Sequence, residues 1–271
     1  MPNGIEEKRR SVLSVVIPVY NEADTLMEVV RRVVELPELL EVVIVDDCST
    51  DDTPNVIQQL AAMFPQVRTQ RHAKNSGKTA ALRTGFGLTR GEVVIVQDAD
   101  LEYSPTEIPE IIRPIIDGHA DVVYGSRFLV RRATRVLYFY HYLANKLLTL
   151  LSNVFTNLNM TDIETGYKAF RGEIIRNMVI ASSGFGFEVE VTAKVAKLRC
   201  AVYEVPISYY GRTYEEGKKI GLLDGVMALW LVFRFNLFCS LRLSFREIPQ
   251  LERRPLRNRE EVSGVTSPPI V

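Results

Sequence analysis

The chain has 271 residues, of which 46% are hydrophobic, and its basic and acidic side chains balance at 33 each. This length is enough for one sizeable α/β domain with attachments, and zero formal net charge disfavours a nucleic-acid-binding protein, which needs a basic surface. Three distant cysteines, Cys48, Cys200 and Cys239, predict neither a disulfide framework nor a zinc site and suit a reducing compartment.

Strands and helices are predicted to alternate over the first half of the chain. Strands are expected at 13–19, 41–45, 66–72, 92–96 and 121–124, and helices at 23–36, from 51 or 52 to about 64, at 76–88 and at 106–116. This alternation predicts a mostly parallel sheet with helices on both faces. In such sheets ligands bind at the carboxyl ends of the strands.

Two later segments have the pattern of apolar helices. In 131–158, clustered arginines precede a broad apolar face, and 220–238 is apolar over most of its circumference. We expect amphipathic helices at a membrane interface, since basic ends suit anionic headgroups; a core helix is the alternative. No run reaches the roughly 18 apolar residues of a membrane span, and the hydrophilic first ten residues are not a signal peptide. The polar residues 241–271 predict a disordered tail after a domain of residues 1–240.

An acidic cluster follows the strand at 92–96. Asp98 and Asp100 are separated by one residue, and Glu102 comes next. Such carboxylates can hold a hard divalent cation, Mg²⁺ or Mn²⁺, together with diphosphate oxygens. That ion would neutralise the charge on a departing nucleotide diphosphate. A solvated turn or a helix N-cap is the alternative, but the position at a strand end favours a metal site.

Two other strand ends carry side chains suited to a nucleoside. Tyr20 offers a stacking face after the first strand, and Glu22 and Asp47 offer hydrogen-bond acceptors for a base or a ribose. Ordinary helix capping explains each of them separately. Together they predict a nucleoside pocket.

Cationic side chains occur in three further segments. The sequence Asn-Ser-Gly-Lys-Thr at 75–79 is similar to a phosphate-binding loop, but His72 stands where the first glycine of that motif belongs. Lys78 is therefore expected near a donor diphosphate without a nucleotide-hydrolysing fold. Arg127, Arg212 and Lys218 are candidates for binding phosphate, with a charged surface loop as the alternative for the last two.

The ordered set of motifs resembles the family 2 glycosyltransferases of the GT-A fold. Within that family, the likeness is strongest to dolichol-phosphate mannosyltransferases and bacterial polyprenyl-phosphate glycosyltransferases. The resemblance runs from about residue 13 to 238 and rests on seven segments: Pro-Val-Tyr-Asn-Glu at 18–22, Val-Asp-Asp-Cys-Ser at 45–49, Asn-Ser-Gly-Lys at 75–78, Asp-Ala-Asp-Leu-Glu at 98–102, Gly-Ser-Arg at 125–127, Asp-Ile-Glu-Thr-Gly-Tyr-Lys at 162–168, and Arg212 with Lys218.

The resemblance implies roles for individual residues. The nucleotide would be held by Pro18, Tyr20, Glu22, Asp47, Lys78 and Asp98, and Mg²⁺ or Mn²⁺ by Asp98, Asp100 and Glu102. The catalytic set would be Asp100, Asp162, Arg127, Arg212 and Lys218, with Asp162 near the acceptor. The implied reaction is an inverting transfer of a sugar, mannose from GDP-mannose first, to a polyprenyl or dolichyl phosphate on the cytoplasmic face of a membrane.

The acceptor chemistry is consistent with this set of residues. A phosphomonoester, whose second pKa is near 6, is already anionic at neutral pH and needs little help from a general base. The enzyme must mainly position the reactants and neutralise charge. Three alternatives stay open: a UDP-sugar donor, a soluble acceptor, and a non-catalytic subunit of a membrane glycosylation complex. Self-association and a membrane-protein partner are also left open by the sequence.

Overall fold

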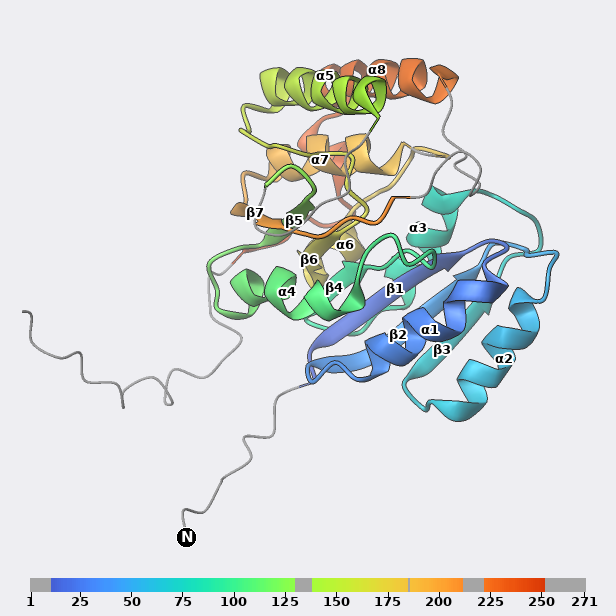
Figure 1. The fold of residues 1–271 in the computed structure, drawn as a ribbon. Coiled ribbons are helices and arrows are strands. Elements are labelled where there is room, and N and C mark those ends of the chain that lie inside the picture. Colours follow the sequence, from blue (N-terminus) through green and yellow to red (C-terminus); the bar gives the residue numbers. More distant parts are fainter. Residues whose placement is uncertain (1–10, 130–137, 185, 212–221, 252–271) are drawn as a thin grey trace, which may run out of the picture.

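One sheet organises the protein. The computed structural model describes residues 11–129, 138–184, 186–211 and 222–251 (Figure 1). Within them, seven strands form a sheet in the order β3-β2-β1-β4-β6-β5-β7. The strands are β1 (Leu13–Val19), β2 (Leu39–Asp46), β3 (Val67–Arg71), β4 (Val93–Val96), β5 (Val122–Ser126), β6 (Lys168–Arg171) and β7 (Val202–Pro206). All neighbouring pairs are parallel except those of β6, which runs antiparallel to both β4 and β5.

The central strands form because their residues suit burial on both faces. β1, β2 and β4 are runs of valine and isoleucine, and Val15 in β1 lies between Val42 and Ile95 of its two neighbours. All three side chains are fully buried. β-Branched residues favour this pleated, doubly covered environment. The five strands expected before residue 127 are confirmed, with ends shifted by at most two residues.

Helices cover both faces of the sheet. One face carries α1 (Ala23–Val34), α2 (Thr53–Met63), the short 3₁₀ helix η1 (Pro105–Glu107) and α4 (Ile108–Ile116), and the other carries α3 (Lys78–Leu88), α6 (Gly172–Asn177) and α7 (Phe187–Leu198). A separate apolar core fills each side. Leu26 and Ile111 belong to the first core, and Leu82, Phe86 and Phe187 to the second. The predicted α/β architecture is thus confirmed.

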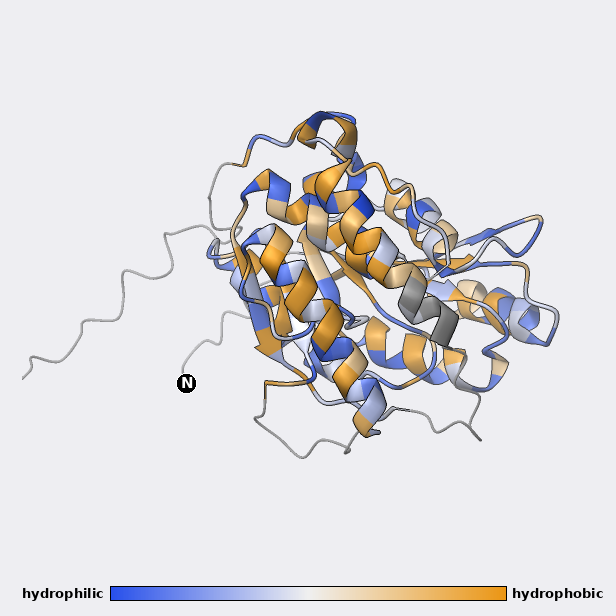
Figure 2. Cartoon of the chain, turned by 90° about the horizontal axis from the view of Figure 1, so that it is seen from above, coloured by the Kyte–Doolittle hydropathy of each residue, from blue (hydrophilic) through white to orange (hydrophobic). Residues whose placement is uncertain are grey.

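A third layer lies over α7. Helices α5 (Phe139–Thr156) and α8 (Leu222–Leu237) run side by side above it (Figure 1). Leu148 of α5 and Val232 of α8 are buried in the second core, while many apolar side chains of the same helices stay exposed. Viewed from above, hydrophobic residues recur along both helices (Figure 2). No helix in the described part of the chain has the length and apolar character needed to cross a bilayer.

The first part of the predicted tail packs against the domain. Residues 241–251 are described: α9 (Leu241–Ser244) follows α8, and Phe245 forms a β-bridge with Met178. Phe245 is 3% exposed and packs in the second core. Leu241 and Leu251 pack against the same core, so several apolar side chains anchor the described part of the predicted tail. Residues 252–271 lie outside the described residues.

Candidate active site

The antiparallel strand brings two distant segments to one edge of the sheet. β1, β2, β4 and β5 all end at this edge, and β6 begins there because it runs in the opposite direction. The loop before β6 therefore lies beside the loop after β4. At the contact, a Cβ on Gly166 would stand 2.5 Å from Asp98 Oδ2 and 2.9 Å from Tyr103 Cε2, so any larger residue would displace these side chains. The Gly166 amide also donates to the Tyr103 hydroxyl at 3.1 Å.

Lys78 and the acidic cluster meet at the same edge. Lys78 is the first residue of α3. Its Nζ atom is 2.7 Å from Asp98 Oδ1 and 3.9 Å from Glu188 Oε1. Burial opposes the charge of Lys78, but Asp98 and then Glu188 raise its pKa above the ordinary value. Burial, Asp98 and Glu102 together raise the pKa of Asp100 to about 7. The cluster thus carries more negative charge than its lysine balances.

This charge excess fits a divalent cation. Asp98, Asp100 and Glu102 supply the hard oxygen atoms that Mg²⁺ and Mn²⁺ prefer. No three histidine, cysteine, aspartate or glutamate side chains in the described residues are grouped to hold a metal on their own. Diphosphate oxygens would therefore have to complete the ligand set. Two of the three carboxylates already have partners: Asp98 contacts Lys78, and Glu102 Oε2 accepts a hydrogen bond from the Tyr209 hydroxyl at 3.0 Å.

Asp47 holds the loop that leads into α3. Its carboxylate accepts hydrogen bonds from the Ser76 amide at 3.0 Å and the Gly77 amide at 2.6 Å. His72 Nδ1 lies 2.7 Å from the same carboxylate, and His72 Nε2 lies 2.9 Å from Thr84 Oγ1. By holding this loop, Asp47 fixes the position of Lys78, which follows Ser76 by two residues. Sequence reasoning assigned no role to His72, since its partners are 25 and 12 residues away.

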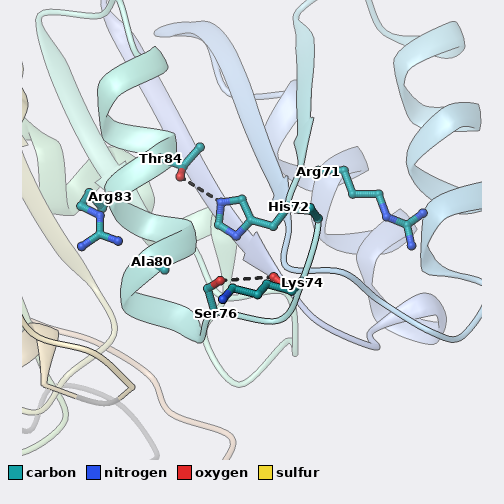
Figure 3. A pocket seen from close by; sticks show the side chains of 8 residues that line it. Arg71, His72, Lys74, Ser76, Ala80, Arg83 and Thr84 are labelled. Carbon is teal, nitrogen blue, oxygen red and sulfur yellow. Dashed lines mark hydrogen bonds between the residues drawn. The ribbon is translucent and has the colours of Figure 1, made fainter.

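A cationic pocket lies on the outer side of this loop. It has a volume of about 360 Å³ and is lined by Arg71, His72, Ala73, Lys74, Ser76, Ala80, Arg83 and Thr84 (Figure 3). Figure 3 shows His72 turned toward Thr84 on α3, with the two basic side chains of Arg71 and Arg83 on opposite sides. Arg71 is anchored to Asp46 Oδ2 at 3.2 Å.

The other residues predicted to bind a nucleoside lie where β1 ends. Pro18 and Tyr20 are partly exposed, and the Glu22 amide donates to Thr53 Oγ1 at 3.0 Å. Asn21 has a left-handed φ of 55° and accepts a hydrogen bond from the Thr50 amide at 2.8 Å. The loops after β1 and β2 are therefore tied together beside Asp47. Their contact with a nucleoside stays a prediction.

Arg127 and Asp162 form a bidentate ion pair. Nε and Nη2 of Arg127 lie 2.7 and 2.8 Å from the two oxygens of Asp162. The carboxylate is fully buried, and Arg127 keeps its pKa below the ordinary value despite burial. The ring of Tyr209 lies 5.3 Å from the guanidinium carbon. The sequence predicted both residues but not their pairing. Arg212 and Lys218 lie outside the described residues.

Comparison with known proteins identifies the family. A model described as Glycosyl transferase family 2 matches residues 14–179, which carry Asp47, Lys78, the acidic cluster and Asp162. The chain belongs to this family. It is therefore a glycosyltransferase, as the motifs predicted.

Several named relatives of this family 2 glycosyltransferase are about equally similar to it. Undecaprenyl-phosphate mannosyltransferase of Micrococcus luteus is 31% identical, over 78% of this chain and 88% of the relative. Polyprenol monophosphomannose synthase of Mycolicibacterium smegmatis is 30% identical, over 76% and 80%. Dolichol-phosphate mannosyltransferase of Pyrococcus furiosus is 32% identical over 77% of this chain, but the match spans only 59% of that protein.

Solved structures support the fold. Glucosyl-3-phosphoglycerate synthase from Mycobacterium tuberculosis superposes with a TM-score of 0.63 at 20% sequence identity, covering 83% of this chain and 80% of that one. The same protein has also been solved with Mn²⁺ and UDP, at a TM-score of 0.64 and 19% identity. At this identity the likeness concerns the fold, and it confirms the GT-A arrangement of this glycosyltransferase.

Proposed function

We propose that this glycosyltransferase moves a hexose from a nucleotide sugar to a polyprenyl or dolichyl phosphate at a membrane surface, with inversion at the anomeric carbon. Mannose from GDP-mannose is the first candidate, because two of the relatives compared above are named as undecaprenyl- and dolichol-phosphate mannosyltransferases and the third as a polyprenol monophosphomannose synthase. The observation that carries the proposal is the acidic cluster beside Lys78 at the carboxyl edge of the sheet.

On the donor side, each group has a chemical task. Asp98 and Asp100, with Glu102 nearby, would hold Mg²⁺ or Mn²⁺, which when bound would neutralise the leaving diphosphate. Tyr20 would stack on the base. Asp47 shapes the loop that positions Lys78. The Lys78 ammonium contacts Asp98 and would move from that carboxylate to a phosphate oxygen of the donor. These groups position the donor and stabilise its charge, which is what the reaction requires.

On the acceptor side, Arg127 is the described cation best placed for a phosphate. Asp162 engages Nε and Nη2, and no hydrogen bond within the described residues engages Nη1. That nitrogen is left to donate to a phosphate oxygen, while Asp162 fixes the guanidinium. An anionic phosphate acts as its own nucleophile, so the role proposed for Asp162 is to position Arg127. Arg212 and Lys218 belong to the same proposal from the sequence.

The membrane part of the proposal rests on α5 and α8. Exposed apolar side chains cover both helices and the residues beside them: Tyr138, Phe139, Tyr140, Leu143, Leu147, Leu150, Val154, Met227, Trp230, Leu237 and Phe238. A surface of this kind suits the headgroup region of a bilayer, where aromatic rings are favoured. We place it on the cytoplasmic face, where nucleotide sugars would be available to the exposed edge of the sheet.

A transfer assay tests the proposal. Purified protein with Mn²⁺ is given GDP-mannose, UDP-glucose or UDP-N-acetylglucosamine, and either a polyprenyl phosphate in mixed micelles or a water-soluble phosphorylated acceptor. We expect labelled sugar in the lipid phase, most rapidly from GDP-mannose. Transfer only to the soluble acceptor would overturn the lipid assignment, and a preference for a UDP-sugar would overturn the choice of donor.

A further inference from the structure

Glu164 lies between the two halves of the proposed site. It belongs to the loop before β6, two residues after Asp162 and two before Gly166, which touches Asp98. Its carboxyl interacts electrostatically with Glu188 on α7 and Lys168 on β6, and burial, followed by Glu188, raises its pKa to about 7. The segment therefore occupies the region between the donor carboxylates and the Arg127–Asp162 pair.

The polar groups here have unused hydrogen-bonding capacity. Oε1 of Glu164 is buried and accepts no hydrogen bond from any of the described residues. Lys168 is fully buried, yet within the described residues its ammonium donates only to the Thr165 carbonyl and otherwise lies 5.1 Å from the Tyr124 ring centroid. Glu188 is 7% exposed, and its nearest cation is Lys78 at 3.9 Å. Leaving such groups unpaired is costly.

A buried carboxylate with a purely structural role looks different in this same protein. Glu190, two residues after Glu188 on α7, accepts hydrogen bonds from the Ala181 amide at 2.8 Å and the Ser182 amide at 2.7 Å. It also pairs directly with Lys194. Every oxygen of Glu190 is satisfied within the protein. Lys168 is as fully buried as Glu190, and Glu164 is partly buried with a buried Oε1, yet within the described residues this oxygen accepts no hydrogen bond and the Lys168 ammonium makes only one.

The chemistry of a matching ligand follows from these groups. The carboxylates of Glu164 and Glu188 would repel a phosphate, and the ammonium groups of Lys168 and Lys78 would repel a cation. An apolar group would leave Glu164 Oε1 and the Lys168 ammonium unpaired. A hydroxyl group both donates and accepts hydrogen bonds, so it can bridge a carboxylate and an ammonium without adding charge.

We propose that Glu164, Lys168 and Glu188 form the subsite that recognises the hydroxyl groups of the transferred sugar. This inference rests on the proposed function, because the sugar is the neutral polyhydroxyl part of a nucleotide-sugar donor. It assigns sugar selectivity to residues that neither the metal cluster nor the nucleoside pocket includes. Carboxylates that accept hydroxyl hydrogen bonds discriminate strongly between epimers, since a misplaced hydroxyl leaves them unpaired.

Calorimetric titration with Mn²⁺ and no acceptor separates the sugar from the nucleotide. Glu164→Gln and Glu188→Gln are titrated with GDP-mannose and with GDP, and with UDP-glucose and UDP. For whichever donor the wild type binds, we expect about 10- to 100-fold weaker binding in both variants, the range for losing hydrogen bonds to a charged group. In Glu164→Gln, the affinity for the sugar-free nucleotide should change less than about twofold. Removing the charge of Glu188, 3.9 Å from Lys78, also changes nucleotide affinity, so for Glu188→Gln the donor-to-nucleotide affinity ratio decides. The matched control, Glu190→Gln, should lower the melting temperature and leave the donor-to-nucleotide affinity ratio unchanged.

Two outcomes overturn the subsite while leaving the proposed function intact. One is equal weakening of nucleotide and donor, which would mean that these residues shape the nucleotide site. The other is unchanged donor affinity in a folded variant. If Glu164→Gln fails to fold, Glu188→Gln and Lys168→Met decide by the same ratio. A wild type that binds none of the donors would refute the proposed function itself, and the subsite with it. Binding by the wild type with unaltered ratios in the variants would refute only the subsite.

Discussion

Asp100 lies in a cluster whose negative charges are not balanced by nearby cations. It is mostly shielded from solvent between Asp98 and Glu102, while the nearest lysine is already paired with Asp98. Burial and both carboxylates disfavour its ionised form. A bound divalent cation reverses this balance, so Asp100 is predicted to matter far more to activity than to folding.

Asp100→Asn should keep the shape of the side chain and remove its charge. We expect sugar transfer to fall about 100-fold or more, as when a preorganised electrostatic group is lost. The apo-protein should melt at the same or a higher temperature, because one of three mutually repelling carboxylates has gone. Initial rates at saturating Mn²⁺ and a thermal melt check both parts. Near-normal turnover would show that Asp100 is not a metal ligand.

Residue patterns alone could predict part of this site. Asp98, Asp100 and Glu102 are neighbours after an apolar strand, so their proximity is evident in the sequence. The pairing of Arg127 with Asp162 joins positions 35 residues apart, and the contact of His72 with Asp47 joins positions 25 apart. Such contacts depend on which strands become neighbours. Nothing in the local pattern of either segment encodes them.

At the scale of elements, α5 presents two different surfaces. Leu148, Thr149 and Ser152 face the protein, whereas Leu147 and Leu150 are 48% and 59% exposed. Leu151, on the same helix, packs against the second core. The sequence pattern correctly predicted a helix here. Packing against α7 and α8 decides which side of α5 is buried.

The exposed side of α5 can be tested with vesicles. Leu147→Glu/Leu150→Glu should reduce flotation with phosphatidylglycerol-containing liposomes about tenfold or more, because two apolar contacts are replaced by charges. Met63→Glu is the matched control, since Met63 is equally exposed, at 49%, but lies on α2. Equal flotation of the double variant and the control, both folded by circular dichroism, would remove the membrane assignment.

Helix α3 packs closely against β1, and two of its glycines differ in the space around them. A Cβ at Gly85 would stand 2.4 Å from Val16 Cγ1, whereas a Cβ at Gly87 would meet nothing within 4 Å. Gly85→Ala should destabilise the protein by about 1–3 kcal/mol through overpacking. Gly87→Ala should stabilise it by about 0.5–1 kcal/mol, because alanine is the better helix former. Urea unfolding of both variants measures the difference, and equal effects would contradict the close packing of α3.

For the whole molecule, nucleotide and metal should act as one ligand. A ligand that binds only the native state at about 100 times its Kd adds about 2.7 kcal/mol, which raises the melting temperature of a chain of this size by roughly 5–10 °C. We expect that shift from GDP or UDP with Mn²⁺, and its loss on addition of EDTA. A shift that survives EDTA would show that the nucleotide binds without the metal.

The architecture was predictable up to the point where the chain turns back. Five strands and their helices follow from periodicity, because each is a local βα unit. β6 does not: it is four residues long, follows a helix of the third layer and enters the sheet antiparallel between β4 and β5. The local sequence pattern therefore does not predict that the loop before it, from Asp162 to Tyr167, lies at the site.

That insertion has a consequence for how the protein is made. β4 and β5 leave the ribosome early but do not pair with each other, since β6 must lie between them. The sheet stays divided until residue 171 has emerged, and Glu188 follows later still. Pairing over such sequence separations is slow, and until then the exposed edges of β4 and β5 are open to other strands. The nascent chain thus contains the acidic cluster first, and the loop before β6 and Glu188, which complete the proposed site, are synthesised later.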